Sequence, residues 1–215
     1  MVRSASSNLD KESSGKMTKS IPFRLLEQKE GTENLVIVLP GAGYSPQAPL
    51  LHYTTGLFNN KGFDVLHINY AFSKEEITSL NEGDLARDVQ LAIDTAIHEK
   101  KYSNIYIVAK SIGTKVLRCL IHHTMFKDAK LVWLTPLIQN DDVFHAMVNS
   151  DHKGLCVFGE KDSHCFIVER FEKLKDNPNL ILKVVEGGNH NLDLEKDPIK
   201  SIDILKRVIS DINDF

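Results

Sequence analysis

Short runs of hydrophobic, often β-branched residues alternate with longer amphipathic stretches from about residue 21 to the end of the chain. This alternation is typical of parallel strands joined by crossover helices. Most of the short runs are hydrophobic at every position, as in strands that helices cover on both faces. We therefore predict an α/β fold, a three-layer α/β/α sandwich whose mostly parallel sheet has about seven strands. The expected strands are 21–28, 35–39, 64–70, 104–109, 130–135, 154–159 and 180–186.

Six helices are expected between and after these strands. The clearest is 82–100, where Leu85, Val89 and Ile93 belong to a stripe of hydrophobic residues at three- and four-residue intervals. We expect this stripe to pack against the sheet. The other expected helices are 47–61, 112–126, 140–149, 163–175 and 198–213.

The first sixteen residues differ from the rest of the chain. They are rich in serine and charged residues and lack the hydrophobic core of a secretory signal. We expect residues 1–16 to be a flexible leader or tag outside the fold. Residues 17–215 contain no internal repeat, low-complexity tract or Pro/Gly-rich linker, and a core of this size does not need to divide. They are expected to form a single domain.

The composition argues against several classes of protein. The formal net charge is -3, so there is no basic surplus to bind nucleic acid. The longest hydrophobic runs fall far short of the roughly 20 residues needed to cross a membrane. The cysteines are odd in number and form no CxxC pair, which argues against a disulfide framework and a zinc site. We expect a cytoplasmic protein that binds neither nucleic acid nor a membrane.

One serine lies where an expected strand meets an expected helix. Ser111 follows the strand 104–109 in a very tight turn, which projects its hydroxyl above the sheet. The Ile112 N–H opens the helix, where developing negative charge is favoured. Gly113 avoids a side chain that would collide with the neighbouring strand. The segment resembles the G-x-S-x-G nucleophile elbow of the α/β-hydrolase family, with Ala109 in place of the first glycine.

Two later segments stand in the order that this family requires, nucleophile then acid then histidine. A hydrophobic strand ending in Gly-x-x-Asp resembles the family's acid turn and makes Asp162 the expected acid. Glu160 is the competing carboxylate, and the alternative role of Asp162 is to cap the next helix. His190 follows a strand that ends in two glycines, and an imidazole with a pKa of about 6.5 suits a general base. The expected catalytic residues are Ser111, Asp162 and His190.

The strand 35–39 breaks into a glycine-rich loop that begins with Pro40. This loop resembles the family's H-G-x-G loop, with proline in place of histidine. The resemblance implies that the backbone amides of Ala42 and Ile112 form the oxyanion hole. The loop lacks the third glycine of a dinucleotide-binding motif and the Gly-Lys-Ser/Thr of a P-loop, which argues against a nucleotide site. Three further residues are expected to bind substrate: Gly43, Tyr44 and Lys110.

The resemblance is to small, lidless members of the family, such as dienelactone hydrolases and esterases. The stretch 137–153 leaves room for one helix and no elaborate lid, and an open site suits small or exposed acyl groups. We expect a serine hydrolase of small-molecule esters or thioesters that forms an acyl-enzyme on Ser111 and needs no cofactor or metal. The same residues suit an acyltransferase or an amidase, and the fold alone also fits a non-catalytic binding or adaptor protein. His164 and Cys165 are expected near the site.

Overall fold

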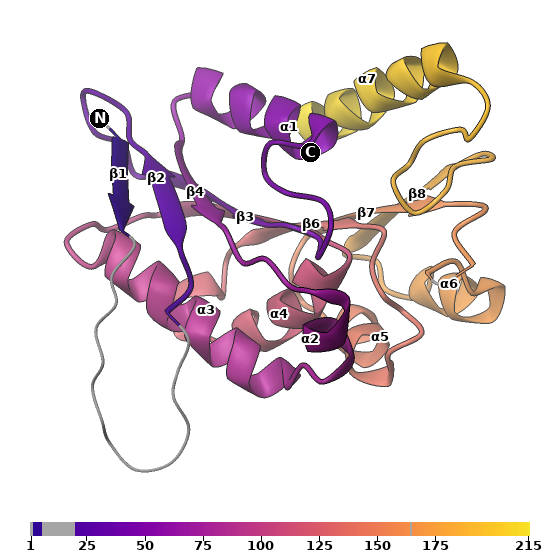
Figure 1. Cartoon of the computed structure of the whole chain (residues 1–215), viewed down its shortest axis with the longest axis horizontal. Helices are drawn as coiled ribbons and strands as arrows, with labels where there is room; N and C mark the ends of the chain where they lie inside the picture. The colour runs from indigo at the N-terminus through magenta and orange to yellow at the C-terminus, as the bar shows by residue number, and fades with distance from the viewer. Residues whose placement is uncertain (1, 6–19, 164) are drawn as a thin grey trace.

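A single sheet runs through the molecule (Figure 1) in the computed structural model, which describes residues 2–5, 20–163 and 165–215. Within these residues eight strands lie in the order β1-β2-β4-β3-β5-β6-β7-β8. The pairs from β4 to β8 are parallel, whereas β1 and β2 pair antiparallel at one edge, which confirms the mostly parallel sheet. The strands are β1 (Val2–Ala5), β2 (Phe23–Leu26), β3 (Asn34–Leu39), β4 (Asp64–Ile68), β5 (Asn104–Lys110), β6 (Lys130–Leu134), β7 (Gly154–Gly159) and β8 (Leu180–Val185).

Helices cover both faces of this sheet, so the predicted three-layer α/β/α arrangement is confirmed (Figure 1). Helices α1 (Pro49–Asn60) and α7 (Pro198–Asp214) pack on one face. The opposite face is covered by α3 (Glu82–Ile97), α4 (Ile112–Leu120), α5 (Asp141–Val148) and α6 (Val168–Leu174).

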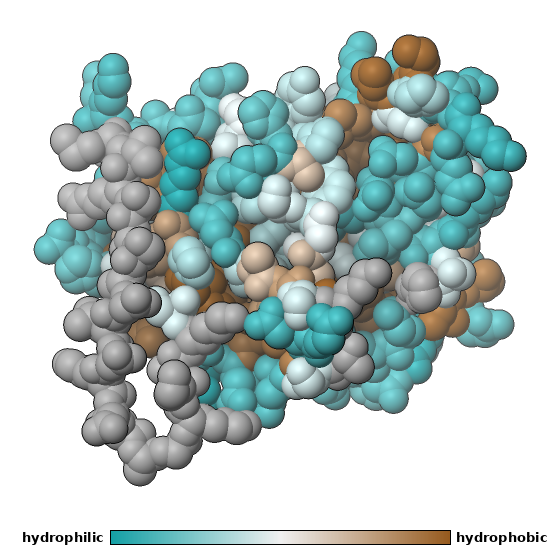
Figure 2. Space-filling view, viewed as in Figure 1, coloured by the Kyte–Doolittle hydropathy of each residue, from teal (hydrophilic) through white to brown (hydrophobic). Residues whose placement is uncertain are grey.

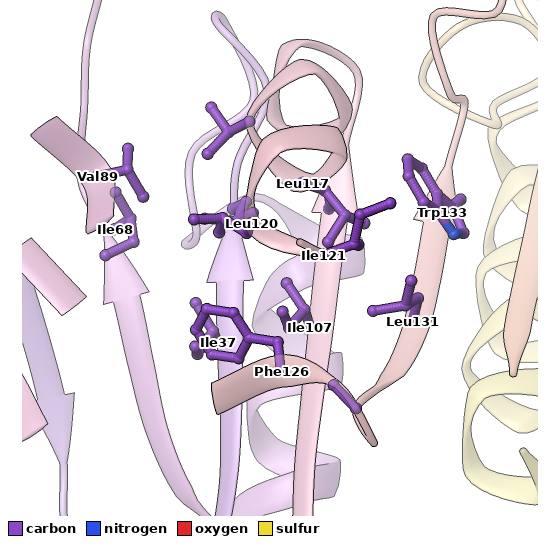
Figure 3. Close-up of a cluster of buried hydrophobic side chains, with 14 of the residues drawn as sticks. Ile37, Ile68, Val89, Ile107, Leu117, Leu120, Ile121, Phe126, Leu131 and Trp133 are labelled. Carbon is purple, nitrogen blue, oxygen red and sulfur yellow. The ribbon is translucent and has the colours of Figure 1, made fainter. Parts of the chain in front are cut away.

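Alternate residues of each buried strand point to opposite helical layers, as the pleat of a strand requires. In β3, Val38 joins the core beneath α1 and α7, while Leu39 joins the core beneath α3 to α6. Figure 3 shows part of the second core, where Leu117 and Leu120 of α4 lie close to Ile107 of β5. This burial on both faces is the physical reason for the uninterrupted hydrophobic runs in the sequence.

The N-terminal edge contains a strand that the sequence did not lead us to expect. Val2–Ala5 form β1, which pairs with β2. The remainder of the expected leader lies outside the described residues, so its flexibility stays a prediction.

The helices differ from expectation at three places. The expected helix 112–126 ends at Leu120, and a short 3-10 helix, η1 (Thr124–Phe126), follows it. The expected helix 163–175 begins only at Val168, because the carbonyl of Asp162 instead accepts the backbone N–H groups of a turn. A short helix that was not expected, α2 (Lys74–Thr78), lies between β4 and α3.

The connection between β6 and β7 contains one helix, α5, as expected for a chain without an elaborate lid. The face of the molecule in Figure 2 is mainly hydrophilic. Hydrophobic side chains are nevertheless exposed on α7, at Ile199 and Ile202. None of the described helices is long and apolar enough to cross a membrane.

Candidate active site

Ser111 lies in a strained turn between β5 and α4. Its backbone has φ 52° and ψ -118°, a conformation that costs a non-glycine residue about 1–3 kcal/mol. The turn is held by hydrogen bonds on both sides, because the Ser111 N–H donates to the Leu134 carbonyl at 3.0 Å and the Thr114 hydroxyl donates to the Ser111 carbonyl at 2.6 Å. The turn thus places Ser111 between the end of β5 and the start of α4, with its Oγ beside His190.

Gly113 shows why the elbow needs a glycine. A Cβ atom at this position would lie 2.4 Å from the carbonyl oxygen of Leu39, on the neighbouring strand β3. The contact is with backbone, which cannot swing aside as a flexible side chain can. The absence of a side chain therefore lets the start of α4 pack directly against the end of β3.

The side chains of Ser111, His190 and Asp162 form one hydrogen-bonded chain. The Ser111 Oγ lies 2.8 Å from His190 Nε2, and His190 Nδ1 lies 2.6 Å from Asp162 Oδ2. An ionised carboxylate can only accept, so the Nδ1 atom carries the proton and Nε2 is left to accept from the serine hydroxyl. Asp162 is 2% exposed, whereas the His190 side chain is 36% exposed, so the chain runs from the interior to an accessible surface.

Glu160, the competing carboxylate, has a different partner. Its side chain accepts the Gly187 N–H at 2.8 Å on the exposed side of the loop before His190. Asp162 is the carboxylate that contacts the imidazole, and its loop packs tightly on the histidine loop. A Cβ atom at Gly159 would lie 2.4 Å from the Asn189 carbonyl. Glu160 thus holds the backbone of the loop before His190, whereas Asp162 contacts the imidazole ring of His190.

The glycine-rich loop after β3 lies beside the serine. A Cβ atom at Gly41 would lie 3.6 Å from the Ser111 Cβ, and Gly41 and Tyr44 exchange two backbone hydrogen bonds that close the loop. A bond to the first residue of the loop also holds it in place, because the Tyr70 hydroxyl donates to the Pro40 carbonyl at 2.6 Å. Among the described residues, neither of the two predicted oxyanion-hole amides, Ala42 N–H and Ile112 N–H, donates to a protein acceptor.

The three residues expected to bind substrate lie in different surroundings. Gly43 is exposed, with open space where a side chain would lie. Tyr44 is half-buried, and its hydroxyl accepts the Leu50 N–H at the start of α1. Lys110 is 0% exposed, so its ammonium does not reach the surface. The structure thus corrects the expectation that Lys110 binds substrate. Its Nζ instead donates hydrogen bonds to the Thr135 hydroxyl and to the carbonyl of His190.

Cys165 was expected near the site, but the sequence could not specify which residue it contacts. Its Sγ lies 3.4 Å from His190 Nδ1, and burial raises the pKa of this thiol, which keeps it protonated. Its position three residues after Asp162 was the only signal. His164 lies outside the described residues.

Asp162, Cys165 and His190 also form the one group among the described residues whose ligand atoms could meet at a metal ion, all within 4.8 Å of one another. Two ligands of a tetrahedral zinc ion, each about 2.0 Å from the metal, lie about 3.3 Å apart. The separation of 2.6 Å between Nδ1 and Oδ2 is shorter and has the length of a hydrogen bond. The spacing therefore fits a hydrogen bond between His190 and Asp162 better than two ligands of one metal ion.

Among known proteins, this chain is similar to solved structures. No family model matches the chain, and no curated protein matches it. An alpha-beta serine hydrolase homologue from Coxiella burnetii is similar over 92% of this chain and 99% of its own, with a TM-score of 0.64 and 11% identity. Est1E from Butyrivibrio proteoclasticus covers 89% of this chain and 94% of its own, with a TM-score of 0.64 and 14% identity. A serine hydrolase without a lid from Xanthomonas campestris covers 86% and 85%, with a TM-score of 0.62 and 16% identity.

Proposed function

The chain has the α/β-hydrolase fold, and on this fold we propose that it is a serine hydrolase of small or exposed esters or thioesters. The observation that carries the proposal is the continuous hydrogen-bonded chain from Ser111 Oγ through His190 to Asp162. The strained backbone at Ser111 supports it, because strain of this kind persists where the surrounding structure and function require it.

The proposed reaction begins with attack of Ser111 Oγ on the acyl carbonyl carbon, while its proton moves to His190 Nε2. Asp162 stabilises the imidazolium that forms. The carbonyl oxygen becomes an oxyanion, which the N–H groups of Ala42 and Ile112 stabilise, each by on the order of 3 kcal/mol. The imidazolium then protonates the leaving alcohol or thiol, and an acyl-enzyme remains. Water activated by His190 attacks this ester, releasing the acid and restoring the serine.

The open surroundings of the site support this substrate class. One helix, α5, occupies the connection in which an elaborate lid would be inserted, and the His190 ring is partly exposed. Est1E, whose fold is similar, has been solved with ferulic acid bound. Both observations support a small acyl group for this chain. p-Nitrophenyl acetate, an ester of a small acyl group, is therefore the first substrate to test.

The first prediction concerns the nucleophile. A fluorophosphonate probe should label the wild-type protein on Ser111, and Ser111→Ala should abolish both the labelling and the hydrolysis of p-nitrophenyl acetate. Loss of a serine nucleophile lowers kcat by on the order of 10⁶-fold. Labelling is measured by intact mass, and hydrolysis by release of p-nitrophenolate.

Ser163→Ala is the matched control, because Ser163 is an exposed serine near the same site and should label and turn over as wild type does. A folded wild-type protein that neither labels nor hydrolyses would contradict the proposal and favour a non-catalytic binding protein. Activity that persists in Ser111→Ala would assign the reaction to another residue.

A further inference from the structure

Lys110 is a buried lysine directly before the proposed nucleophile. It is the last residue of β5 and is 0% exposed. Burying an ammonium group costs free energy unless hydrogen bonds and charges compensate for the lost water. Burial lowers its pKa to about 8, an effect that the negative charges of Asp162 and Asp193 oppose. The ammonium is therefore retained at a cost, which calls for a reason beyond packing.

The contacts of the Lys110 ammonium join three separate parts of the site. Its Nζ donates to the Thr135 hydroxyl at 2.9 Å, just after the end of β6. It also donates to the backbone carbonyl of His190 at 2.7 Å. The ring of Tyr44, in the glycine-rich loop, lies 4.8 Å from the same nitrogen. One cation thus contacts the residue that carries the proposed base and the loop that carries a proposed oxyanion amide.

His190 needs such support because it lies in a stretch without a helix or strand, 186–197. Within this stretch, Asn189 holds the turn together by accepting the N–H groups of Asn191 and Asp193 on its side-chain oxygen. Those bonds shape the turn but do not fix its position relative to β5. Other bonds join the loop to the residues after β7, because the Gly187 N–H donates to Glu160 and the Lys161 N–H donates to the Gly188 carbonyl. The bond from Lys110 joins it to β5, since it links the backbone of His190 to the residue next to Ser111.

We propose that Lys110 is a positioning residue, whose ammonium holds the His190 backbone so that Nε2 meets Ser111 Oγ. This inference rests on the proposed function of Ser111 and His190. Lys110 acts through His190 and touches no reacting atom. Displacement of a catalytic group by about 1 Å can lower a rate by on the order of 10²-fold. Loss of the ammonium should therefore lower kcat strongly and leave substrate binding nearly unchanged.

Lys130 provides a matched control at the opposite end of the sheet. Its Nζ donates to the Tyr106 hydroxyl at 2.9 Å and to a main-chain oxygen of Phe215, the last residue of this sequence, at 2.7 Å. It also lies 5.1 Å from the ring of Tyr106. Lys130 thus also contacts a hydroxyl, a main-chain oxygen and an aromatic ring. It differs in being half-buried, and as the first residue of β6 it lies away from the proposed site.

The test compares Lys110→Met with Lys130→Met, because methionine keeps most of the hydrophobic stem and removes the charge. Circular dichroism and thermal unfolding first establish that each variant folds. With p-nitrophenyl acetate, we expect Lys110→Met to lower kcat by on the order of 10²-fold with little change in KM, and Lys130→Met to keep the wild-type kcat. The second readout is the downfield proton NMR signal of His190 Nδ1–H, which should shift or broaden only in Lys110→Met.

The outcomes separate this inference from the proposed function. An active wild type with an unchanged kcat and NMR signal in Lys110→Met would overturn the positioning role alone. An inactive, unlabelled wild type would overturn the proposed function, and the NMR comparison would still decide whether Lys110 positions His190. If Lys110→Met does not fold, Thr135→Val removes one partner of the ammonium and should lower kcat in the same direction by a smaller factor. An unchanged kcat in Thr135→Val would then contradict the proposal.

Discussion

Charged groups are buried at both ends of the parallel strands, but their hydrogen-bond partners differ in kind. At the amino ends, Asp64 is 0% exposed and its carboxylate accepts from three donors. These are the backbone N–H of Gln28 at 2.7 Å, the Lys100 ammonium at 2.6 Å and the Tyr102 hydroxyl at 2.7 Å. At the carboxyl ends, the equally buried Lys110 donates to two neutral oxygens and faces a tyrosine ring.

The difference suggests which end serves the fold and which serves chemistry. Asp64 is met by an opposite charge and by two further donors, which is what a buried charge needs for the stability of the structure. Lys110 and the Ser111–His190–Asp162 chain have partners that also fix the direction of a reactive side chain. We infer that substitutions at the amino end should reduce stability, and that those at the carboxyl end should reduce activity.

The largest effect after loss of the nucleophile should come from the acid. Asp162→Asn would hold the imidazole in the wrong tautomer and should lower kcat by about 10⁴-fold, which corresponds to about 5 kcal/mol of activation free energy. Glu160→Gln is the control, because Glu160 contacts the Gly187 backbone and not the ring. The hydrolysis rate of p-nitrophenyl acetate checks both. Equal losses in the two variants would mean that the acid has been assigned wrongly.

At the amino end the expected change is in stability. Asp64→Asn removes the negative charge and replaces one carboxylate oxygen by an NH2 group, which cannot accept from Lys100. Breaking a buried ion pair costs about 3–5 kcal/mol. Urea unfolding should show this loss, while kcat of the folded variant stays near that of wild type. Asp94→Asn, at an exposed position of α3, should leave the unfolding free energy within about 0.5 kcal/mol of wild type. A large fall in kcat for Asp64→Asn would contradict the inference that the buried charge at the amino ends of the strands contributes to stability and not to activity.

His67 is a buried histidine whose hydrogen-bond partner is a neutral hydroxyl. It is 4% exposed on β4, and its Nε2 lies 2.8 Å from the Thr55 hydroxyl, which itself donates to the Leu51 carbonyl. Nε2 therefore carries the proton, and Nδ1 has no partner among the described residues. Burial first, and the charge of Arg24 second, lower the pKa of His67 from 6.5 to about 4.

The sign of the pH effect follows from this pKa. Between pH 6.5 and about 4 the unfolded chain binds a proton that the folded chain does not, so stability should fall as the pH falls through this window, by about 3 kcal/mol at most. Urea unfolding at several pH values should show a shallower fall in His67→Gln than in wild type. His122→Gln, at an exposed position, should keep the wild-type slope. Identical slopes in all three proteins would show that His67 is not held neutral.

The order of elements was accessible from the sequence because each buried strand left a readable pattern. The runs 35–39 and 154–159 agree closely with β3 (Asn34–Leu39) and β7 (Gly154–Gly159). Strand β1 and the five-residue helix α2 left no hydrophobic run or stripe to read. The ends of α4 and α6 were also misjudged, because local side-chain and backbone hydrogen bonds decide where a helix stops.

For the site, the sequence by itself determined the candidates Ser111, Asp162 and His190, because each follows a strand and the carboxyl ends of parallel strands meet at one edge of a sheet. Only the tertiary structure decided which carboxylate reaches the imidazole and that the Lys110 ammonium turns inward to His190. The reason is physical. Strand periodicity is encoded by neighbours along the chain, whereas the direction of a side chain at a loop depends on contacts between residues far apart in sequence.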